Sequence, residues 1–173
     1  MFKIGETVMH PSSGVCSVSE ITTRNITPRE KRDYYDLKPV YKEENTTIFL
    51  PVDCNKVGVR RILPPDRIDQ IISLVDLKSK LWVDNDNIRK ESFHEILKSG
   101  NHEKIIQLIA ELHQHKEKRE AAGKNLRISD AKILKEAEKI IHEEFAYALN
   151  IPLEDTADFI MKKLGLEIKK TEE

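Results

Sequence analysis

Candidate nucleophiles and metal ligands are scattered along the chain, so the first question is whether any of them could form a catalytic centre. His113 and His115 are two residues apart, and on a helix their side chains would point about 200° away from each other, too far to share one metal ion. We therefore expect both to be solvated helix residues. Cys16 would need a nearby base and positive charge to act as a nucleophile, and its neighbours in the sequence suggest neither. The sequence contains no glycine-rich phosphate loop, nucleophile elbow, zinc-binding helix motif or Cys-x-x-Cys motif. We therefore expect a protein that is not an enzyme and needs no cofactor or metal, and an enzyme built on Cys16 beside His10 is kept as an alternative.

The stretch KSKLWVDNDNIRKES holds the only tryptophan of the chain in a strongly hydrophilic neighbourhood. Trp82 is followed first by Asp84 and Asp86 and only then by Arg89 and Lys90. Two interpretations are open: an exposed side chain that contacts a partner, or a packing residue whose partners are distant in sequence. The two acidic residues would repel phosphate groups if they faced DNA.

A basic run is the second candidate binding feature, because it spans the end of one expected helix, a turn and the start of the next. Residues 88–135 hold 11 Lys and Arg against 7 Asp and Glu, whereas residues 136–173 hold 5 against 10. Such a cluster can neutralise several phosphates of a nucleic acid. The alternative is an ordinary solvated turn between antiparallel helices, because Glu117 and Glu120 lie among the basic residues and partly balance their charge. The basic residues of the run are Lys116, Lys118, Arg119, Lys124, Arg127, Lys132 and Lys135.

The elements that must position these residues change in character near residue 65. Before that point, apolar and polar residues alternate, and β-branched and aromatic types are frequent, as in Thr46–Leu50. The stretch Pro11–Gly14 predicts a turn, since Pro restricts φ and Gly permits positive φ. Roughly four or five short strands in this part predict a small, strongly bent sheet or barrel.

After Pro64 and Pro65 the apolar residues recur with the period of a helix. The expected helices are one capped by Asp66, one over Arg89–Lys98 that ends at Gly100 and has Ile88 facing inward, one stopped by Gly123, one capped by Ser129, and one from Leu153 to Lys163. The predicted fold class is therefore α+β, with a β module over residues 1–64 and an all-α domain of about five helices over residues 66–173.

The cysteines, the N-terminal residues and the lengths of the apolar stretches indicate the cellular location to expect for the protein. Cys16 and Cys54 lie in apparent strands of a chain whose N-terminus lacks a basic region followed by an apolar run. We therefore expect reduced thiols and a cytoplasmic location. No stretch approaches the roughly 18 apolar residues of a membrane span, so we expect no membrane contact. The net charge of −1 by itself neither supports nor excludes nucleic acid as a partner.

Three stretches in a fixed order, FKIGETVMHPSSGVCSVSEI, YYDLKPV and IFLPVDCNKVGVRRI, resemble the CarD/CdnL family of bacterial transcription regulators. The β module of that family is shared with transcription-repair coupling factors. The helical half is similar too, with a tryptophan after its first helix, LKSGN before its third and an ending like ISDAKILKEAEKIIHEEFAYAL. The resemblance covers about residues 1–150, and the rest looks like an extension. It implies a Tudor-like module that binds the RNA polymerase β subunit and a helical domain that touches promoter double-stranded DNA at the upstream edge of the transcription bubble, in a monomeric protein.

The resemblance also implies which residues bind polymerase. Arg24 in TTRNI matches a polymerase-contacting arginine, and Phe49 falls where relatives place either an arginine or an apolar residue. An apolar contact beside an exposed strand edge fits a partner that adds a strand to the sheet. Burial of Phe49 in the core of the β module is the alternative. The implied polymerase-binding residues are Thr23, Arg24, Ile48, Phe49 and Pro51.

In the family, the tryptophan is a wedge that enters the minor groove at a distorted base step, which implies this role for Trp82. Relatives usually follow the tryptophan almost at once with paired basic residues, whereas here Arg89 and Lys90 come seven and eight positions later. Either a loop insertion lets Trp82 reach the groove, or Trp82 has become a packing residue. The implied DNA-contacting residues are Trp82, Arg89, Lys90, Lys116, Lys118, Arg119, Lys124, Arg127 and Lys132.

These inferences predict a transcription regulator without enzymatic activity. It would bind the polymerase β subunit and stabilise the promoter open complex by contacting DNA. The alternative is a polymerase-binding adaptor whose helical domain binds another protein and not DNA.

Overall fold

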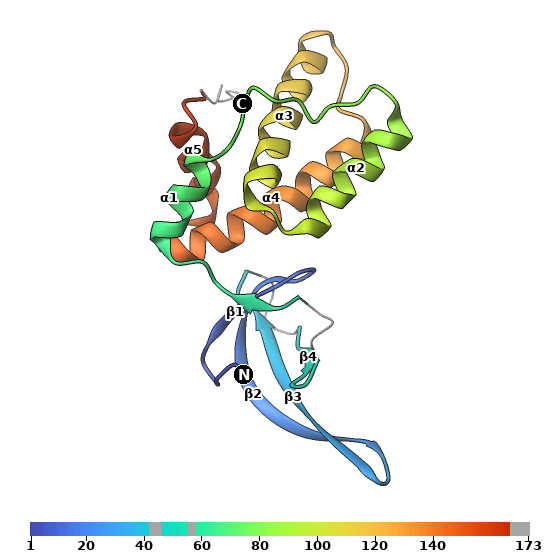
Figure 1. Ribbon diagram of the computed structural model, residues 1–173, viewed down its shortest axis with the longest axis vertical. Helices are drawn as coiled ribbons and strands as arrows, with labels where there is room; N and C mark the ends of the chain where they lie inside the picture. The colour runs from blue at the N-terminus through green and yellow to red at the C-terminus, as the bar shows by residue number, and fades with distance from the viewer. Residues whose placement is uncertain (42–45, 55–57, 167–173) are drawn as a thin grey trace. The chain divides into compact units, whose positions relative to one another are not determined.

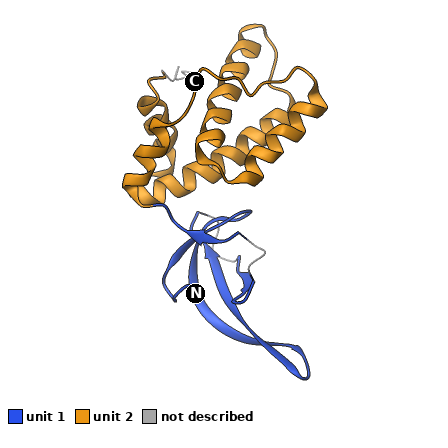
Figure 2. Ribbon diagram, in the orientation of Figure 1, with its two compact units in different colours: residues 1–63 blue, residues 64–173 orange. Residues whose placement is uncertain are grey.

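The computed structural model describes residues 1–41, 46–54 and 58–166 of the chain. It divides into two compact units, 1–63 and 64–173, which Figure 2 shows in different colours. The first unit is an open antiparallel sheet, and the second consists of helices (Figure 1). This arrangement confirms the predicted α+β fold class.

The sheet of the first unit has the strand order β4-β3-β2-β1-β5, so β4 and β5 are its edge strands within the described residues. Its strands are β1 (Thr7–His10), β2 (Gly14–Thr27), β3 (Glu30–Pro39), β4 (Ile48–Pro51) and β5 (Arg60–Arg61). All neighbouring strands pair in antiparallel fashion. The long strands β2 and β3 form a hairpin whose outer part, beyond Thr22 and Tyr34, extends past the strands on either side (Figure 1).

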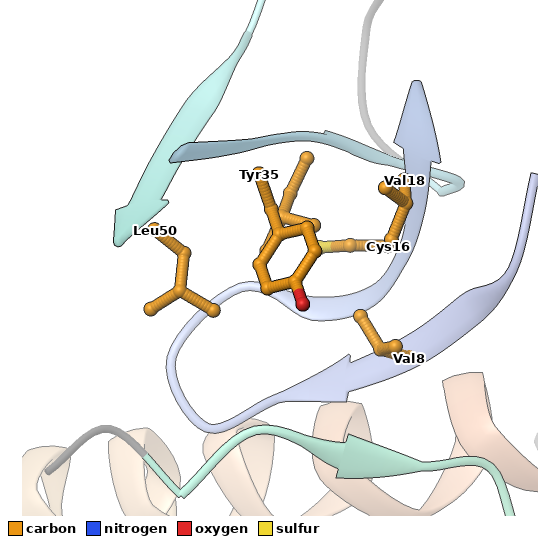
Figure 3. Close-up of a cluster of buried hydrophobic side chains, with 6 residues drawn as sticks. Val8, Cys16, Val18, Tyr35 and Leu50 are labelled. Atoms are coloured by element: carbon orange, nitrogen blue, oxygen red, sulfur yellow. The ribbon is translucent and has the colours of Figure 1, made fainter. Parts of the chain in front are cut away.

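One face of the sheet carries the hydrophobic core of this unit (Figure 3). Because successive side chains of a strand point to opposite faces, Tyr35 and Leu37 enter the core while Asp36 between them points away from it. The core residues are Val8, Cys16, Val18, Tyr35, Leu37 and Leu50. Cys16 is therefore a buried free thiol, and Cys54 is a half-buried one.

The predicted turn at Pro11–Gly14 connects β1 to β2. Gly14 has a φ of 78°, in the region that glycine adopts without steric cost. Inside the turn, Nδ1 of His10 accepts hydrogen bonds from the backbone N–H groups of Ser12, at 3.3 Å, and Ser13, at 3.2 Å. His10 thus stabilises the turn.

Over residues 64–166, the described part of the second unit, there are five α-helices, in agreement with the predicted number of about five. They are α1 (Pro65–Ser73), α2 (Asp86–Ser99), α3 (His102–Ala121), α4 (Ile128–Leu149) and α5 (Thr156–Lys163), with a short 3-10 turn at Leu153–Asp155 before α5. The two longest helices, α3 and α4, pack against each other along apolar stripes that include Leu108 and Phe145, both fully buried. Each such side chain contributes about 1.5–3 kcal/mol of hydrophobic free energy.

The N-termini of four helices differ from the prediction, and one of them is α5, which begins at Thr156 and not at Leu153. The N-cap of α1 is Pro64 and that of α4 is Arg127, so Asp66 and Ser129 lie in first turns and are not caps. Helix α2 begins three residues earlier than expected because Asn85 caps it. The side-chain oxygen of Asn85 accepts hydrogen bonds from the two N–H groups of the first turn, each at 3.1 Å.

The earlier start of α2 also corrects the expected orientation of Ile88. This residue lies in the first turn and is 55% exposed, whereas Phe93, Ile96 and Leu97 face the core as predicted. Helix α2 ends at Gly100, whose φ of 65° suits a glycine C-cap.

Candidate functional site

Two of the predicted polymerase-binding residues, Arg24 and Phe49, form one patch on the sheet face opposite the core. Phe49 lies opposite Asp36 in the β3–β4 pairing, and its side chain is 46% exposed. The Arg24 guanidinium carbon lies 3.7 Å from the centroid of the Phe49 ring, a cation–π contact. Nη2 of Arg24 also lies 3.5 Å from Oδ2 of Asp36. The alternative that Phe49 belongs to the core is therefore wrong.

The other three predicted residues do not all join this patch. Thr23 and Ile48 point to the opposite side of the sheet from Arg24 and Phe49, because side chains alternate along a strand. The Thr23 hydroxyl donates to Oδ1 of Asp33 at 2.6 Å, and Ile48 packs against the core. Pro51, by contrast, lies two residues beyond Phe49 and shares its face.

The patch borders the free edge of the sheet. Strand β4 pairs with β3 only, so within the described residues its other side presents unpaired backbone groups. An edge of this kind can accept a strand from a partner, and exposed side chains next to it then provide specificity. The Arg24–Phe49 patch has the position that such a specificity element needs.

Trp82 lies in the connection between α1 and α2 and is half-buried. The His115 ring of α3 stacks on the indole, with ring centroids 3.6 Å apart and planes inclined by 16°. The guanidinium carbon of Arg89 lies over the indole at 4.2 Å from its centroid. The indole N–H, at the exposed edge, donates to Oδ1 of Asp84 at 3.2 Å. Trp82 therefore packs within the helical unit through its faces and reaches the surface with its N–H edge.

Side chains of α3 hold the backbone before and at Trp82. The carboxylate of Glu111 accepts hydrogen bonds from the backbone N–H groups of Leu81, at 2.8 Å, and Trp82, at 3.0 Å. The amide of Gln107 donates to the carbonyl oxygen of Ser79 at 2.8 Å. Glu111 and Gln107 are not predictable as loop-binding residues from the sequence, because a solvated helix position and a position that binds a loop carry the same kinds of polar residue.

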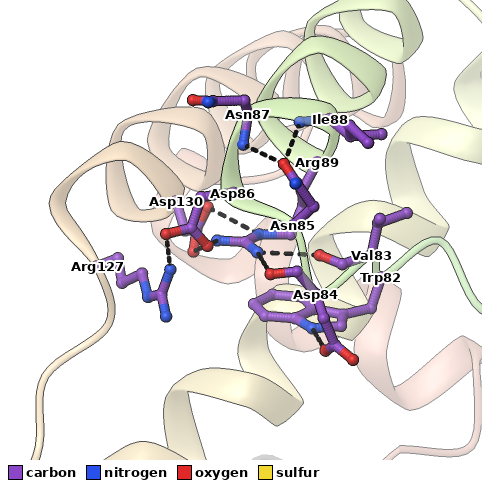
Figure 4. A network of polar contacts seen from close by, with 10 residues as sticks. All are labelled: Trp82, Val83, Asp84, Asn85, Asp86, Asn87, Ile88, Arg89, Arg127 and Asp130. Atoms are coloured by element: carbon purple, nitrogen blue, oxygen red, sulfur yellow. Dashed lines mark hydrogen bonds and ion pairs between the residues drawn. The ribbon is translucent and has the colours of Figure 1, made fainter.

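Arg89 is the centre of a buried polar network (Figure 4). It is 1% exposed, and its guanidinium bonds the equally buried carboxylate of Asp130 in α4, with Nη2 3.1 Å from Oδ2. The same guanidinium donates to Oδ1 of Asp86 at 2.8 Å and to the carbonyl oxygen of Val83 at 2.9 Å. Arg89 was predicted to contact DNA, but in this structure its donors are buried and bonded. Arg89, itself in α2, therefore links the connection that contains Trp82 to α4.

The exposed part of the network is the ion pair between Arg127 and Asp86 (Figure 4). The hydrogen bond from Arg89, together with the charge of Arg127, lowers the pKa of the Asp86 carboxyl. Asp86 thus pairs with Arg127 of the basic run as well as with Arg89, so the charge of Arg127 is already balanced within the protein. Asp84 stays exposed beside Trp82.

The remaining basic residues divide between two grooves and the turn after α3. Lys118 lines a groove together with Trp82 and His115, whereas Lys90 and Lys132 line a second groove together with Ile128. Within the part of the chain that the structure describes, four of the predicted basic side chains are exposed and have no ion pair. These are Lys90, Lys118, Lys124 and Lys132. The other two side chains have partners. Lys116 forms an ion pair with Glu120 at 3.9 Å, and Arg119 donates a hydrogen bond to the carbonyl oxygen of Asn125 at 2.7 Å.

The residues first considered for catalysis have structural partners. The Cys16 thiol is buried and lies 3.6 Å from the carbonyl oxygen of Gly14. His113, expected to be solvated, is half-buried with Nε2 2.7 Å from Oε1 of Glu138. His115, also expected to be solvated, stacks on Trp82.

Residues 1–41, 46–54 and 58–166 contain neither a metal-binding cluster nor a membrane-spanning helix. In these residues no three His, Cys, Asp or Glu side chains gather in a way that could hold a metal ion. None of the helices there is both long and apolar enough to cross a membrane.

The comparison with family models assigns both units. Residues 2–63 match the CarD-like/TRCF RID domain, and residues 71–161 match the CarD C-terminal domain. This pair of domains defines a class of transcription regulators that bind RNA polymerase and are typically not enzymes. The chain belongs to the CarD family.

Proposed function

We propose that the protein binds the β subunit of RNA polymerase through its sheet and stabilises the promoter open complex through its helical unit. The helical unit would contact double-stranded DNA at the upstream edge of the transcription bubble. The match to both CarD-family domains, in this order and over most of the chain, is the observation that carries the proposal.

Polymerase binding is supported by the Arg24–Phe49 patch. The patch combines a cation with an exposed ring beside an open strand edge, so a partner strand could pair with β4 while its side chains meet Phe49. The Arg24–Phe49 contact is exposed and so contributes about 0.5–1 kcal/mol in the free protein, and about 2 kcal/mol or more once a bound partner excludes water from it.

DNA contact is supported by the exposed lysines of the helical unit, which could neutralise phosphates on either side of a groove. The stabilising effect would come from binding open DNA more tightly than closed DNA. A difference of about 1.4 kcal/mol shifts that equilibrium tenfold. Trp82 remains a candidate for direct contact through its exposed N–H edge.

The adaptor alternative is favoured by one observation, the exposed carboxylate of Asp84 beside Trp82. This negative charge disfavours phosphate, whereas the charge of Asp86 is balanced by its arginine partners. An adaptor would bind polymerase and a further protein without changing the lifetime of the open complex.

The lifetime of the open complex tests the proposal. Open complexes formed by the cognate RNA polymerase on a promoter fragment are challenged with a DNA competitor, with and without the protein. A roughly tenfold longer half-life with the protein would support the proposal. An unchanged half-life, under conditions in which the protein co-purifies with polymerase, would favour the adaptor.

A further inference from the structure

We infer that a pocket beside strand β4 receives an apolar side chain from the polymerase strand that pairs with this edge of the sheet. The pocket has a volume of about 290 Å³ and lies on the core side of the sheet, opposite the Arg24–Phe49 patch. This inference rests on the proposed function, since the proposed strand addition brings the partner to β4. It adds a second contact to that proposal and specifies the chemistry of the residue that fills it.

The pocket is an opening in the hydrophobic core of the first unit. Tyr35 and Leu50, two members of that core, line it and are only 2% and 5% exposed (Figure 3). Phe2, Val52 and Val59 line it as well, and they pack against the core while staying partly exposed. Such residues bury their remaining apolar surface when one more side chain packs against them. The pocket therefore offers apolar surface to a partner.

The register of β4 places this pocket within reach of a strand added to the edge. Phe49 and Pro51 share one face of β4, whereas Ile48 and Leu50 point to the core side, where Val52 also packs. Residues directly opposite each other in paired strands point to the same face. A strand paired with β4 would thus direct one side chain toward Phe49 and the next one along its chain toward the pocket.

The lining of the pocket favours an aliphatic occupant. Among the described residues that line it, none has a charged side chain. The hydroxyl of Tyr35 already accepts a hydrogen bond from the backbone N–H of Phe2 at 3.0 Å. A charged or strongly polar side chain would lose its hydration here without gaining a partner. We therefore expect Val, Ile or Leu at this position of the partner strand, and the first two also suit a strand conformation.

The N-terminal wall of the pocket is fixed before any partner binds. The rings of Phe2 and Tyr35 are in contact, with centroids 5.6 Å apart and planes inclined by 58°. Further along this segment, the N–H of Gly5 donates to the carbonyl oxygen of Val18 at 2.8 Å. These contacts hold the segment against β2 and β3. A pocket that is already formed costs little ordering entropy on binding.

The first test fills the pocket. In Val52→Phe a larger apolar side chain would take the space that the partner's side chain needs. We expect this full-length variant to bind the cognate RNA polymerase roughly tenfold more weakly than the wild type in a titration, as the loss of one buried apolar contact predicts. The matched control is Ile21→Phe, which enlarges an exposed apolar residue of β2 outside the pocket and should bind like the wild type.

The second test uses the wild-type protein, so it does not depend on how well a variant folds. Cys54 lines the pocket and is a half-buried free thiol, whereas Cys16 is a fully buried one. Iodoacetamide should alkylate Cys54 in the free protein. Polymerase should slow this reaction in proportion to the bound fraction, because the inserted side chain closes the pocket. Mass spectrometry of the two cysteine-containing peptides measures both rates, and Cys16 should stay unreacted throughout.

The outcomes separate this inference from the proposed function. Polymerase binding that Val52→Phe fully retains would overturn the inference and leave the proposed function standing. Binding that leaves the alkylation rate of Cys54 unchanged would overturn it in the same way. An equal loss of affinity in Ile21→Phe would also overturn it, since the effect would then not come from the pocket. A wild-type protein that does not bind polymerase would overturn both the inference and the proposed function.

Discussion

The guanidinium of Arg89 lies over the indole of Trp82, 4.2 Å from its centroid, and at the same time bonds Asp130 in the first turn of α4. One buried cation therefore joins the connection after α1 to two helices. This relationship explains how a tryptophan can pack in a hydrophilic stretch of sequence. Its two nearest partners are a cation and an imidazole, and neither looks like a core residue in the sequence.

Removing Arg89 should destabilise the helical unit strongly. In Arg89→Met the Asp130 carboxylate stays buried without its partner, and the expected loss is about 3–5 kcal/mol of unfolding free energy. Denaturant unfolding followed by the emission of Trp82 measures this loss. The matched control is Lys90→Met, which removes the exposed neighbouring charge and should change stability by no more than about 0.5 kcal/mol.

A double variant separates the ion pair from the packing of Arg89. Arg89→Met combined with Asp130→Asn removes both charges, and its loss should be smaller than the sum of the two single losses, since no uncompensated charge remains buried. Additive losses would mean that Arg89 and Asp130 contribute to the free energy of unfolding independently, so that their ion pair adds no stability of its own.

The His115 ring that stacks on Trp82 should make stability depend on pH. Burial, followed by the charge of Lys118, lowers the pKa of His115 below its ordinary value of 6.5, with Arg89 acting in the same direction and Glu111 and Asp130 opposing. The unfolded chain therefore takes up this proton at a higher pH than the folded one. The stabilising contribution is complete above pH 6.5 and is lost as the pH falls from 6.5 through the folded-state pKa.

Unfolding free energies at pH 7.5 and 5.5 test this pH dependence. His142 has a pKa lowered mainly by burial and contributes with the same sign. His115→Gln should therefore reduce the loss of stability on acidification without abolishing it. An equal loss in the variant and the wild type would exclude His115 as a titrating group in this range.

Much of the fold could be predicted from the sequence because its signals are local. Alternation of apolar residues predicts strands, a 3.6-residue period predicts helices, and Gly100 marks a helix end by its freedom at positive φ. Helix starts were less predictable, since several polar residues near each start could serve as the cap. Asn85 was overlooked in this way, and its cap turns Ile88 toward solvent.

The candidate site was harder to predict because its contacts are long-range. The Arg89–Asp130 pair joins residues far apart in the chain, and an arginine in a charged stretch looks the same whether it faces DNA or is buried. Phe49 could not be assigned to the core or the surface until the strand register placed it opposite Asp36. The resemblance points to regions of the chain, and the structure shows which side chains within them pack in the interior and which lie at the surface.

Polymerase binding should depend on the Arg24–Phe49 patch. Arg24→Glu places a carboxylate next to Asp36 and removes the cation above Phe49, so we expect co-purification with the β subunit to be lost. Phe49→Ala should weaken binding by roughly tenfold, the effect of removing a well-buried aromatic contact. Arg29→Glu makes the same charge change in the turn between β2 and β3 and should leave binding intact. Unchanged co-purification with Arg24→Glu would contradict the assignment of the patch.

The salt dependence of open-complex stabilisation should reveal which of the two lysine-lined grooves faces DNA. The variant Lys90→Gln/Lys132→Gln removes two charges beside Ile128, whereas Lys118→Gln/Lys124→Gln removes the same charge beside Trp82 and in the turn after α3. Each lost phosphate contact lowers the slope of log affinity against log salt by about 1. We therefore expect the first variant to lower the slope by about 2 when the stabilisation is measured across a series of KCl concentrations. The second variant should leave the slope close to that of the wild type. The reverse result would place DNA at the Trp82 groove, since a lysine affects this slope only where it displaces counterions from phosphate.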